Sequence, residues 1–270
     1  MDPTSTAATT DPQSLGDRVA AAEGVDEAVD AFLGWIDDRG LTLYPHQEES
    51  LLEIAGGSHV IVNTPTGSGK SLIASAAHSV AIARGQRSFY TAPIKALVSE
   101  KFFDLAATFG AERVGMLTGD AAVNHDAPII CCTAEVLANM ALRDGHHAPV
   151  GQVVMDEFHY FADPDRGWAW QVPLLELTDV QHVLLSATLG DVTRFETDLL
   201  RRSGRPVSVV RSASRPVPLH HEFRLEPLTE VLEELLATDQ APIYLVHFTQ
   251  AGAAERAQSL MSLKLCTREE

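Results

Sequence analysis

The stretch TPTGSGKS, residues 64–71, directly follows an apolar β-branched run, Val60-Ile61-Val62. This order indicates a strand, a glycine-rich turn and a helix starting near Lys70, which is the context of a phosphate-binding loop. Glycines at 67 and 69 let backbone N–H groups approach phosphate oxygens, because no Cβ obstructs them. In such a loop Lys70 reaches the β- and γ-phosphates, and the Ser71 hydroxyl ligates Mg²⁺. We therefore predict that nucleotide contacts come from Thr64, Pro65, Thr66, Gly67, Ser68, Gly69, Lys70 and Ser71.

The loop departs from the general pattern at its first position, where Thr64 replaces a glycine. A glycine-rich turn that binds no ligand is the alternative. An acidic pair further along the chain favours the nucleotide site. It lies in VVMDEFH, residues 153–159, at the end of an apolar strand.

Paired acids at a strand end stand where α/β sheets place their ligands. Asp156 can hold the metal, directly or through water, and Glu157 can orient and polarise the water that attacks the γ-phosphate. Two solvated acids at the start of a helix are the alternative. With the phosphate loop upstream, the pair indicates an ATP–Mg²⁺ site.

Composition bounds the class of protein. The chain has 270 residues, 45% of them hydrophobic and 21% charged, which are values of a globular protein with a sizeable core. Its length allows one large α/β domain and part of another. No apolar run is long enough to span a membrane, and the first residues lack the features of a signal peptide, so we expect a cytoplasmic protein without membrane contact. Cys131 and Cys132, adjacent on one strand, should face opposite sides and both be buried.

The formal net charge is −17, which does not suggest a protein that grips nucleic acid. Net charge governs solubility and non-specific association, whereas a binding groove needs only local donors. We therefore expect weak non-specific affinity and a strong dependence on nucleotide state.

The hydrophobic pattern divides the chain into five parts. We predict a disordered tail over 1–17, an N-terminal helix over 18–42, an α/β ATP-binding domain over 43–211, a linker over 212–227, and the incomplete beginning of a second α/β domain over 228–270. Alternating strands and helices imply an α/β fold with a mostly parallel sheet that is covered on both faces.

Expected strands lie at 59–63, 88–92, 113–117, 128–132, 152–155, 182–186 and 206–210. Expected helices lie at 70–84, 95–109, 134–142, 168–175 and 191–202. In the last part we expect a helix at 228–237, a strand at 243–246 and a helix at 251–263.

A third motif, Ser186-Ala187-Thr188, closes the strand LLSAT. Small hydroxyl residues at a strand end can hydrogen-bond the metal-site acids and transmit the change that follows γ-phosphate loss to a neighbouring domain. We predict that Ser186 and Thr188 couple the nucleotide site to a neighbouring domain.

The ordered series TPTGSGKS, TAPIKALVSEK, LTGDAAVNHDA, CCTAEVLANM, DEFHYFADPDRG and LLSATL resembles the superfamily 2 DExH-box (DEAD/DEAH-type) ATP-dependent helicases. Within them it is most similar to the superkiller-like group and its bacterial, actinobacterial-type members. Threonine or alanine commonly stands at the position of Thr64 in this family. The resemblance covers residues 43–210 and continues more weakly into PIYLVHFTQA. It implies that 43–211 is a RecA-like P-loop ATP-binding domain and that 228–270 is the beginning of a second RecA-like domain.

The resemblance implies further roles. Gln47, in Tyr44-Pro45-His46-Gln47, corresponds to the residue that reads adenine, and an amide can satisfy the paired donor and acceptor of that base. His159 would link the metal site to the second domain. The positions that match nucleic-acid backbone contacts are Pro93, Lys95, Thr118, Gly119, Thr133 and Glu135.

By this resemblance the protein is an ATP-dependent helicase that acts on single-stranded or partly duplex nucleic acid, with RNA favoured over DNA by the PIKAL segment. We expect the chain to lack most of the second domain, including its arginine fingers, which can be worth about 10³ to 10⁵ in rate. The chain alone should then bind ATP–Mg²⁺, turn it over weakly and not unwind duplexes. A nucleotide-gated nucleic-acid-binding scaffold is the alternative, and a metabolic P-loop kinase is a third, less supported hypothesis.

Overall fold

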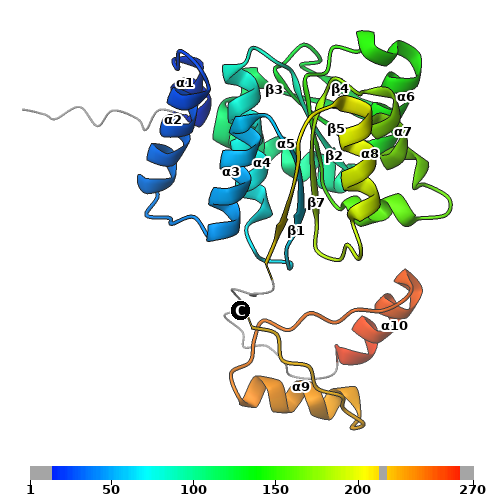
Figure 1. Ribbon diagram of the computed structural model, residues 1–270. Coiled ribbons are helices and arrows are strands. Elements are labelled where there is room, and N and C mark those ends of the chain that lie inside the picture. Colours follow the sequence, from blue (N-terminus) through cyan, green and yellow to red (C-terminus); the bar gives the residue numbers. More distant parts are fainter. Residues whose placement is uncertain (1–13, 213–217, 262–270) are drawn as a thin grey trace, which may run out of the picture. The chain divides into compact units, whose positions relative to one another are not determined.

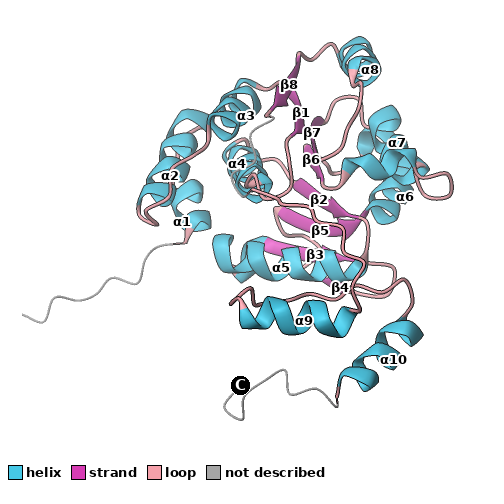
Figure 2. Cartoon of the chain, turned by 90° about the horizontal axis from the view of Figure 1, so that it is seen from below, coloured by secondary structure: helices cyan, strands magenta, loops and turns pink. Residues whose placement is uncertain are grey.

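The computed structural model describes residues 14–212 and 218–261. The chain divides into two units, Met1–Val217 and Pro218–Glu270. The first unit contains an eight-stranded sheet (Figure 1), whose strand order is β4-β3-β5-β2-β6-β7-β1-β8 (Figure 2). Every neighbouring pair is parallel except β3 and β4, which are antiparallel. The predicted α/β class with a mostly parallel sheet is confirmed.

The strands are β1 (His59–Asn63), β2 (Ser88–Ala92), β3 (Val114–Leu117), β4 (Ala122–Val123), β5 (Ile129–Thr133), β6 (Gln152–Met155), β7 (Gln181–Ser186) and β8 (Val207–Arg211). The α-helices of this unit are α1 (Leu15–Ala20), α2 (Val25–Asp37), α3 (Pro45–Gly56), α4 (Lys70–Ala83), α5 (Lys95–Phe109), α6 (Ala134–Asp144), α7 (Trp168–Glu176) and α8 (Thr193–Ser203). Short 3₁₀ turns are η1 (Ala111–Arg113), η2 (Gly145–His147) and η3 (Phe158–Ala162).

Alternation along the strands builds two cores, one on each face of the sheet. Val60 and Val62 belong to one core and Ile61 to the other, because successive side chains of a strand point to opposite faces. Cys131 and Cys132 divide in the same way and are both buried, as predicted. Helices α1 to α5 cover the first face and α6 to α8 the second (Figure 2).

Helix α4 is the central helix of the first face. From Ile73 to Ala81 every residue of α4 is buried, because the helix contacts β2, β6 and β7 on one side and α1, α2 and α3 on the other. A helix buried all round has apolar or small residues on every side, and the sequence KSLIASAAHSVAIA provides them. This packing holds the first residues of α4, Lys70 and Ser71, at one edge of the sheet.

The N-terminal segment differs from its prediction. The single helix expected over 18–42 is two helices, α1 and α2, because Gly24 at φ +145° interrupts the chain between them. Most of the expected tail over 1–17 lies outside the described residues. Its last part, however, is helical from Leu15, where Ser14 accepts a hydrogen bond from the Asp17 backbone N–H at 3.1 Å.

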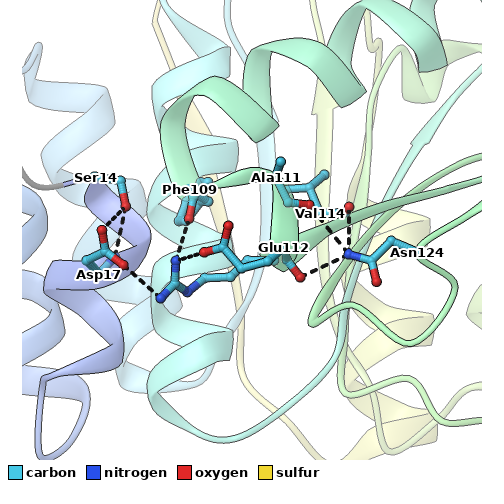
Figure 3. A network of polar contacts seen from close by, with 8 residues as sticks. Ser14, Asp17, Phe109, Ala111, Glu112, Val114 and Asn124 are labelled. Atoms are coloured by element: carbon cyan, nitrogen blue, oxygen red, sulfur yellow. Dashed lines mark hydrogen bonds and ion pairs between the residues drawn. The ribbon is translucent and has the colours of Figure 1, made fainter.

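Helix α1 is tied to the end of α5 by a polar network (Figure 3). Arg113 donates to Asp17 at 2.8 Å and to the Phe109 carbonyl at 3.1 Å, and it also pairs with Glu112. Burial of Leu15 and Val19 adds apolar contact. The approach is close enough that a Cβ on Gly16 would fall onto the Phe109 carbonyl oxygen. The expected tail is therefore part of the packed unit from Ser14 onward.

In the second unit, α9 (Leu228–Ala237) has its predicted bounds. Helix α10 (Gln250–Leu260) begins one residue before its prediction, and residues 262–263 of the expected helix lie outside the described residues. The strand predicted at 243–246 is wrong: these residues form no strand, and Tyr244 and Val246 are 90% and 76% exposed. A strand needs a hydrogen-bonding neighbour, and the described part of this unit has only helices besides irregular chain. The predicted linker is irregular over 218–227, and 213–217 lie outside the described residues.

Two stacked histidines lie at the amino ends of β1 and β7. The rings of His59 and His182 are 5.3 Å apart, and His59 Nδ1 accepts from the His182 backbone N–H at 3.0 Å. With that acceptor, His59 is the tautomer that donates from Nε2 to Ser203 Oγ at 2.9 Å. Burial, followed by the neighbouring His182, lowers the pKa of His59 to about 3. Burial also lowers the pKa of His182 to about 4. Both rings are neutral in the folded protein.

We predict opposite effects for two glycine-to-alanine substitutions. Gly16→Ala should lower the free energy of unfolding by about 1–3 kcal/mol, because the new methyl must push α1 away from α5. Gly34→Ala, inside α2 where nothing lies within 4 Å of the new Cβ, should raise it by roughly 0.5–1 kcal/mol. Urea denaturation of both variants measures these changes, and a stable Gly16→Ala protein would contradict the docking of α1.

We also predict an acid-sensitive stability. A histidine with a folded pKa below its ordinary 6.5 stabilises the fold fully above pH 6.5 and loses that contribution as the pH falls toward the folded value. The free energy of unfolding should therefore fall by about 1.4 kcal/mol per pH unit for each such histidine. Between pH 6.5 and 5, His182→Gln should reduce the slope of unfolding free energy against pH by about 1.4 kcal/mol per pH unit, the contribution of one proton. Urea denaturation at each pH measures this slope. Equal slopes in the two proteins would count against the neutral pair.

Candidate nucleotide site and nucleic-acid face

The order of three neighbouring strands brings the predicted motifs together. Strand β7 pairs in parallel with β1 on one side and with β6 on the other. The phosphate loop follows β1, the acidic pair follows β6, and Ser186 ends β7. Because parallel strands end at the same edge, all three motifs lie at one edge of the sheet. A hydrogen bond of 3.2 Å from the Thr64 N–H to the Ser186 carbonyl joins two of them directly.

The phosphate loop has the conformation that its glycines predict. Gly67 and Gly69 have φ values of +81° and +77°, in the left-handed region that other residues rarely adopt. Inside the loop, the hydroxyls of Thr64 and Ser68 are 2.7 Å apart and both residues are buried. Lys70 Nζ lies over the loop, donating to the carbonyls of Thr64 at 3.0 Å and Pro65 at 3.1 Å. Although Thr64 is not a glycine, its hydroxyl therefore joins the two ends of the loop through the contact with Ser68.

The first turn of α3 supports the phosphate loop from outside. His46 Nε2 donates to the Ser68 carbonyl at 2.8 Å, and Gln47 Nε2 donates to the Gly69 carbonyl at 3.0 Å. Gln47 Oε1 accepts from the Tyr44 backbone N–H at 2.8 Å. Gln47 is buried, and its amide fastens α3 to the loop. Its contact with adenine stays a prediction.

The acidic pair follows β6 in a constrained turn. Asp156 Oδ1 accepts from the Glu157 N–H at 2.9 Å, and Asp156 Oδ2 accepts from the Tyr90 hydroxyl on β2. Burial and then the Asp156 carboxylate raise the pKa of Tyr90 well above its usual value, so the phenol stays a donor. Glu157 has φ +49°, a left-handed conformation that costs energy in a residue with a Cβ. The two acids thus differ in backbone conformation and in partners, which suits the separate roles predicted for them.

His159 stands between the acidic pair and Ser186. Its Nδ1 lies 3.3 Å from Glu157 Oε2 and 3.5 Å from Ser186 Oγ. Ser186 Oγ also accepts from the Thr188 backbone N–H at 3.3 Å. A chain of polar contacts therefore runs from Glu157 through His159 to the SAT segment, whose coupling role stays a prediction.

A cavity of about 380 Å³ lies where these elements meet. It is lined by Thr66, Gly67, Gly69, Lys70, Ser71, Tyr90, Lys101, Asp156, Glu157 and Leu185. A larger cavity, about 510 Å³, lies between α7 and α8 and has mainly apolar walls. The smaller cavity has the chemistry of a nucleotide site.

Its lining fits a triphosphate with Mg²⁺. Two lysines and a glycine-rich loop at a helix N-terminus suit phosphate oxygens. A hydroxyl on Ser71 and a carboxylate on Asp156 are the hard oxygen ligands that Mg²⁺ prefers. In the part of the chain that the structure describes, no cluster of three or more histidine, cysteine or acidic side chains could hold a metal by itself.

Five of the six positions predicted to contact nucleic acid form two groups. In the first group, Lys95 Nζ and Thr118 Oγ1 each donate to Asp120 Oδ1 at 2.8 Å, and the neighbouring Gly119 is exposed. In the second group, Glu135 and the Pro93 carbonyl accept hydrogen bonds from Arg166. Thr133 is 8% exposed at the end of β5. These groups follow β2, β3 and β5, at the same edge as the nucleotide cavity.

Over residues 44–195 the chain matches the DEAD/DEAH box helicase family. It belongs to this family. The fold class, the resemblance to DExH-box helicases and the nucleotide-binding class of the protein are thereby confirmed.

Curated members of the family from several organisms are similar to the chain. Probable helicase HelY of Mycobacterium leprae is 37% identical over 216 residues, 78% of this chain and 23% of HelY. The chloroplastic DExH-box ATP-dependent RNA helicase DExH15 of Arabidopsis thaliana is 41% identical over 175 residues, 62% of this chain and 15% of that protein. ATP-dependent RNA helicase mtr4 of Schizosaccharomyces pombe is 37% identical over 182 residues, which are 67% of this chain and 16% of mtr4. The chain thus spans less than a quarter of the length of these relatives.

Solved helicases share the fold. The DUF1998 helicase MrfA has a TM-score of 0.63 at 19% identity, over 89% of this chain and 41% of MrfA. The Hef helicase domain of Pyrococcus furiosus has a TM-score of 0.53 at 21% identity, over 76% of this chain and 46% of that chain. At these identities the likeness shows the RecA-like fold alone. No helix in residues 14–212 or 218–261 is long and apolar enough to cross a membrane.

Four residues at the candidate sites were not predicted: His46, Tyr90, Lys101 and Arg166. Each acts on a segment distant in sequence, so spacing gave no signal for it. Lys101, on α5, donates to Ser71 Oγ at 3.3 Å and pairs with Asp104 at 3.2 Å, with its side chain only 19% exposed. Its presence in TAPIKALVSEK was visible, but its reach to the phosphate loop depends on how α4 and α5 pack.

We predict that Lys101 strengthens binding of the triphosphate. Lys101→Met should weaken ATP binding about tenfold, the loss expected for a charge-assisted contact to phosphate. Binding of AMP should change little, because the ammonium lies by Ser71 and the predicted β- and γ-phosphate positions. Calorimetric titration with both nucleotides measures this difference, with Arg201→Met on α8 as the charge-matched control. Equal losses for ATP and AMP would indicate a purely structural lysine.

Proposed function

We propose that the chain is the ATP-binding part of an ATP-dependent nucleic-acid helicase of the DExH type. One observation carries the proposal: the phosphate loop and the acidic pair line a single cavity, and Ser186 directly follows Leu185, which also lines it, because β7 lies between β1 and β6. A nucleotide-binding protein needs only the first motif. A motor also needs an acid that positions water and a contact that transmits the change to a neighbouring domain. The contacts of His159 with Glu157 and Ser186 support that second role.

The proposed chemistry is positioning and charge neutralisation. Lys70 and the loop N–H groups would hold the phosphates, and Ser71 with Asp156 would hold Mg²⁺. The ion would supply neutralisation of the phosphate charge. Glu157 orients and polarises the attacking water, while Tyr90 fixes the Asp156 carboxylate through its hydrogen bond.

We propose RNA as the favoured substrate. The names of two relatives, DExH15 and mtr4, specify RNA helicases, and the PIKAL segment resembles the RNA-acting group. One solved neighbour, MrfA, is bound to DNA and AMPPNP, so DNA is the comparison to make. A cytoplasmic location remains a prediction from the sequence.

We predict ATP hydrolysis that nucleic acid accelerates. Turnover by the chain, measured with protein in excess over ATP, should rise with single-stranded RNA more than with single-stranded DNA. Glu157→Gln should reduce it by about 10²-fold or more while leaving ATP binding, because only water activation is lost.

Other outcomes would favour other functions. Nucleotide-dependent binding of RNA with no turnover in either protein would favour a nucleotide-gated scaffold. Turnover that requires a small-molecule acceptor would favour a kinase.

A further inference from the structure

Arg166 stands in a fixed loop on the path from the acidic pair to α7. The loop reads DPDRG over residues 163–167. Asp163 Oδ1 accepts from the backbone N–H groups of Asp165 and Arg166, at 2.9 and 2.7 Å. Gly167 packs so tightly that a Cβ there would fall onto the carbonyl oxygens of Phe161 and Asp163. The backbone at Arg166 is therefore held in one place.

The Arg166 side chain joins two segments that are distant in sequence. Its Nε and Nη2 donate to Glu135 Oε1, at 2.9 and 2.6 Å, and Nη2 also donates to the Pro93 carbonyl at 2.6 Å. Pro93 precedes α5, and Glu135 lies in the first turn of α6. One guanidinium thus aligns the starts of two helices at the predicted nucleic-acid face.

Charge explains why this face needs Arg166. Glu135 is assigned to a surface that meets a polyanion, and a lone carboxylate there would repel phosphates. The chain as a whole carries −17, so its general field offers no compensation. Arg166 offsets the Glu135 charge at hydrogen-bonding distance.

Arg166 also keeps donors for a ligand. A guanidinium has five N–H donors, and the contacts to Glu135 and Pro93 use three. Its side chain is 38% exposed. The ring of Trp170 lies 5.9 Å from the guanidinium carbon, and Trp170 Nε1 donates to the Asp156 carbonyl at 3.5 Å. The fork is therefore oriented in advance, and an oriented fork loses little entropy on binding phosphate.

We propose that Arg166 binds a backbone phosphate of the nucleic acid, with Glu135 and the Pro93 carbonyl as the groups that orient it. This inference rests on the proposed helicase function and adds a residue to its nucleic-acid face. Glu135 acts through Arg166 and does not meet the phosphate. Lys95 differs from Arg166 because its pair with Asp120 is exposed on both sides, 58% and 68%, and its ammonium is free to reorient.

The test measures how RNA affinity depends on salt. Each phosphate contact to a single strand contributes about 0.7 to the slope of log K against log salt concentration. Arg166→Gln should weaken binding of a labelled oligo(U) about tenfold and reduce that slope by about 0.7. Fluorescence anisotropy between about 50 and 200 mM KCl, with a non-hydrolysable ATP analogue, supplies both values. Arg166→Lys should recover most of the slope and only part of the affinity, because an ammonium keeps the charge but not the fork.

Two further variants separate binding from a structural role. Arg143→Gln removes the same charge from α6 at a side chain that is 72% exposed and paired with Asp144, and it should leave the slope unchanged. Glu135→Gln should weaken binding and keep the slope, because Arg166 remains.

If the Arg166→Gln protein keeps the wild-type slope of log K against log salt concentration, the inference is overturned. Arg166 would then only join the starts of α5 and α6, even if the melting temperature of the variant falls. Wild-type protein that shows no salt-dependent binding to RNA or DNA would overturn the proposed function itself.

Discussion

Strand β7 hydrogen-bonds β1 along one edge and β6 along the other, and all three strands run in the same direction. This pairing sets the distance between the phosphate loop and the acidic pair, because each motif begins where its strand ends. The Thr64–Ser186 hydrogen bond and the His159 contacts both depend on it. Strands β1, β6 and β7 are buried and hydrogen-bonded to one another, and a site built at the ends of such strands is positioned more precisely than a site built on loops alone.

Acidic groups at this edge are each matched by a specific donor. Tyr90 bonds Asp156, Lys95 bonds Asp120, and Arg166 bonds Glu135. Lys70 and Lys101 line the same cavity as Asp156 and Glu157. A chain with a large negative net charge can thus present surfaces for anions, since binding responds to local charge at short range.

The sequence predictions were most accurate where the signal lay within a single segment of the chain. Helix α9 and strands β1, β2 and β6 kept their predicted bounds, and β3, β5, β7 and β8 differ by one residue at one or both ends. Side-chain periodicity is a property of the segment itself, so it locates such elements well. The two-residue strand β4 was missed, since its pairing with β3 leaves no periodic pattern. The 243–246 segment has a strand-like pattern but has no partner strand in the described part of its unit. At the N-terminus, a helical pattern was recognised, but the break at Gly24 and the docking of Ser14–Asp17 were not.

The sequence by itself determined the α/β class, the phosphate loop with its two left-handed glycines, the acidic pair and the order of the motifs. These depend on neighbours along the chain, where glycine torsions and strand alternation act within a few residues. Only the tertiary structure decided that β7 separates β1 from β6 and that Gln47 and His46 hold the phosphate loop. It also decided that Lys101 reaches this loop and that Arg166 reaches Glu135 on α6. Those contacts join residues from about 20 to more than 100 positions apart, and hydrogen-bond geometry at such separations is set by packing and not by spacing.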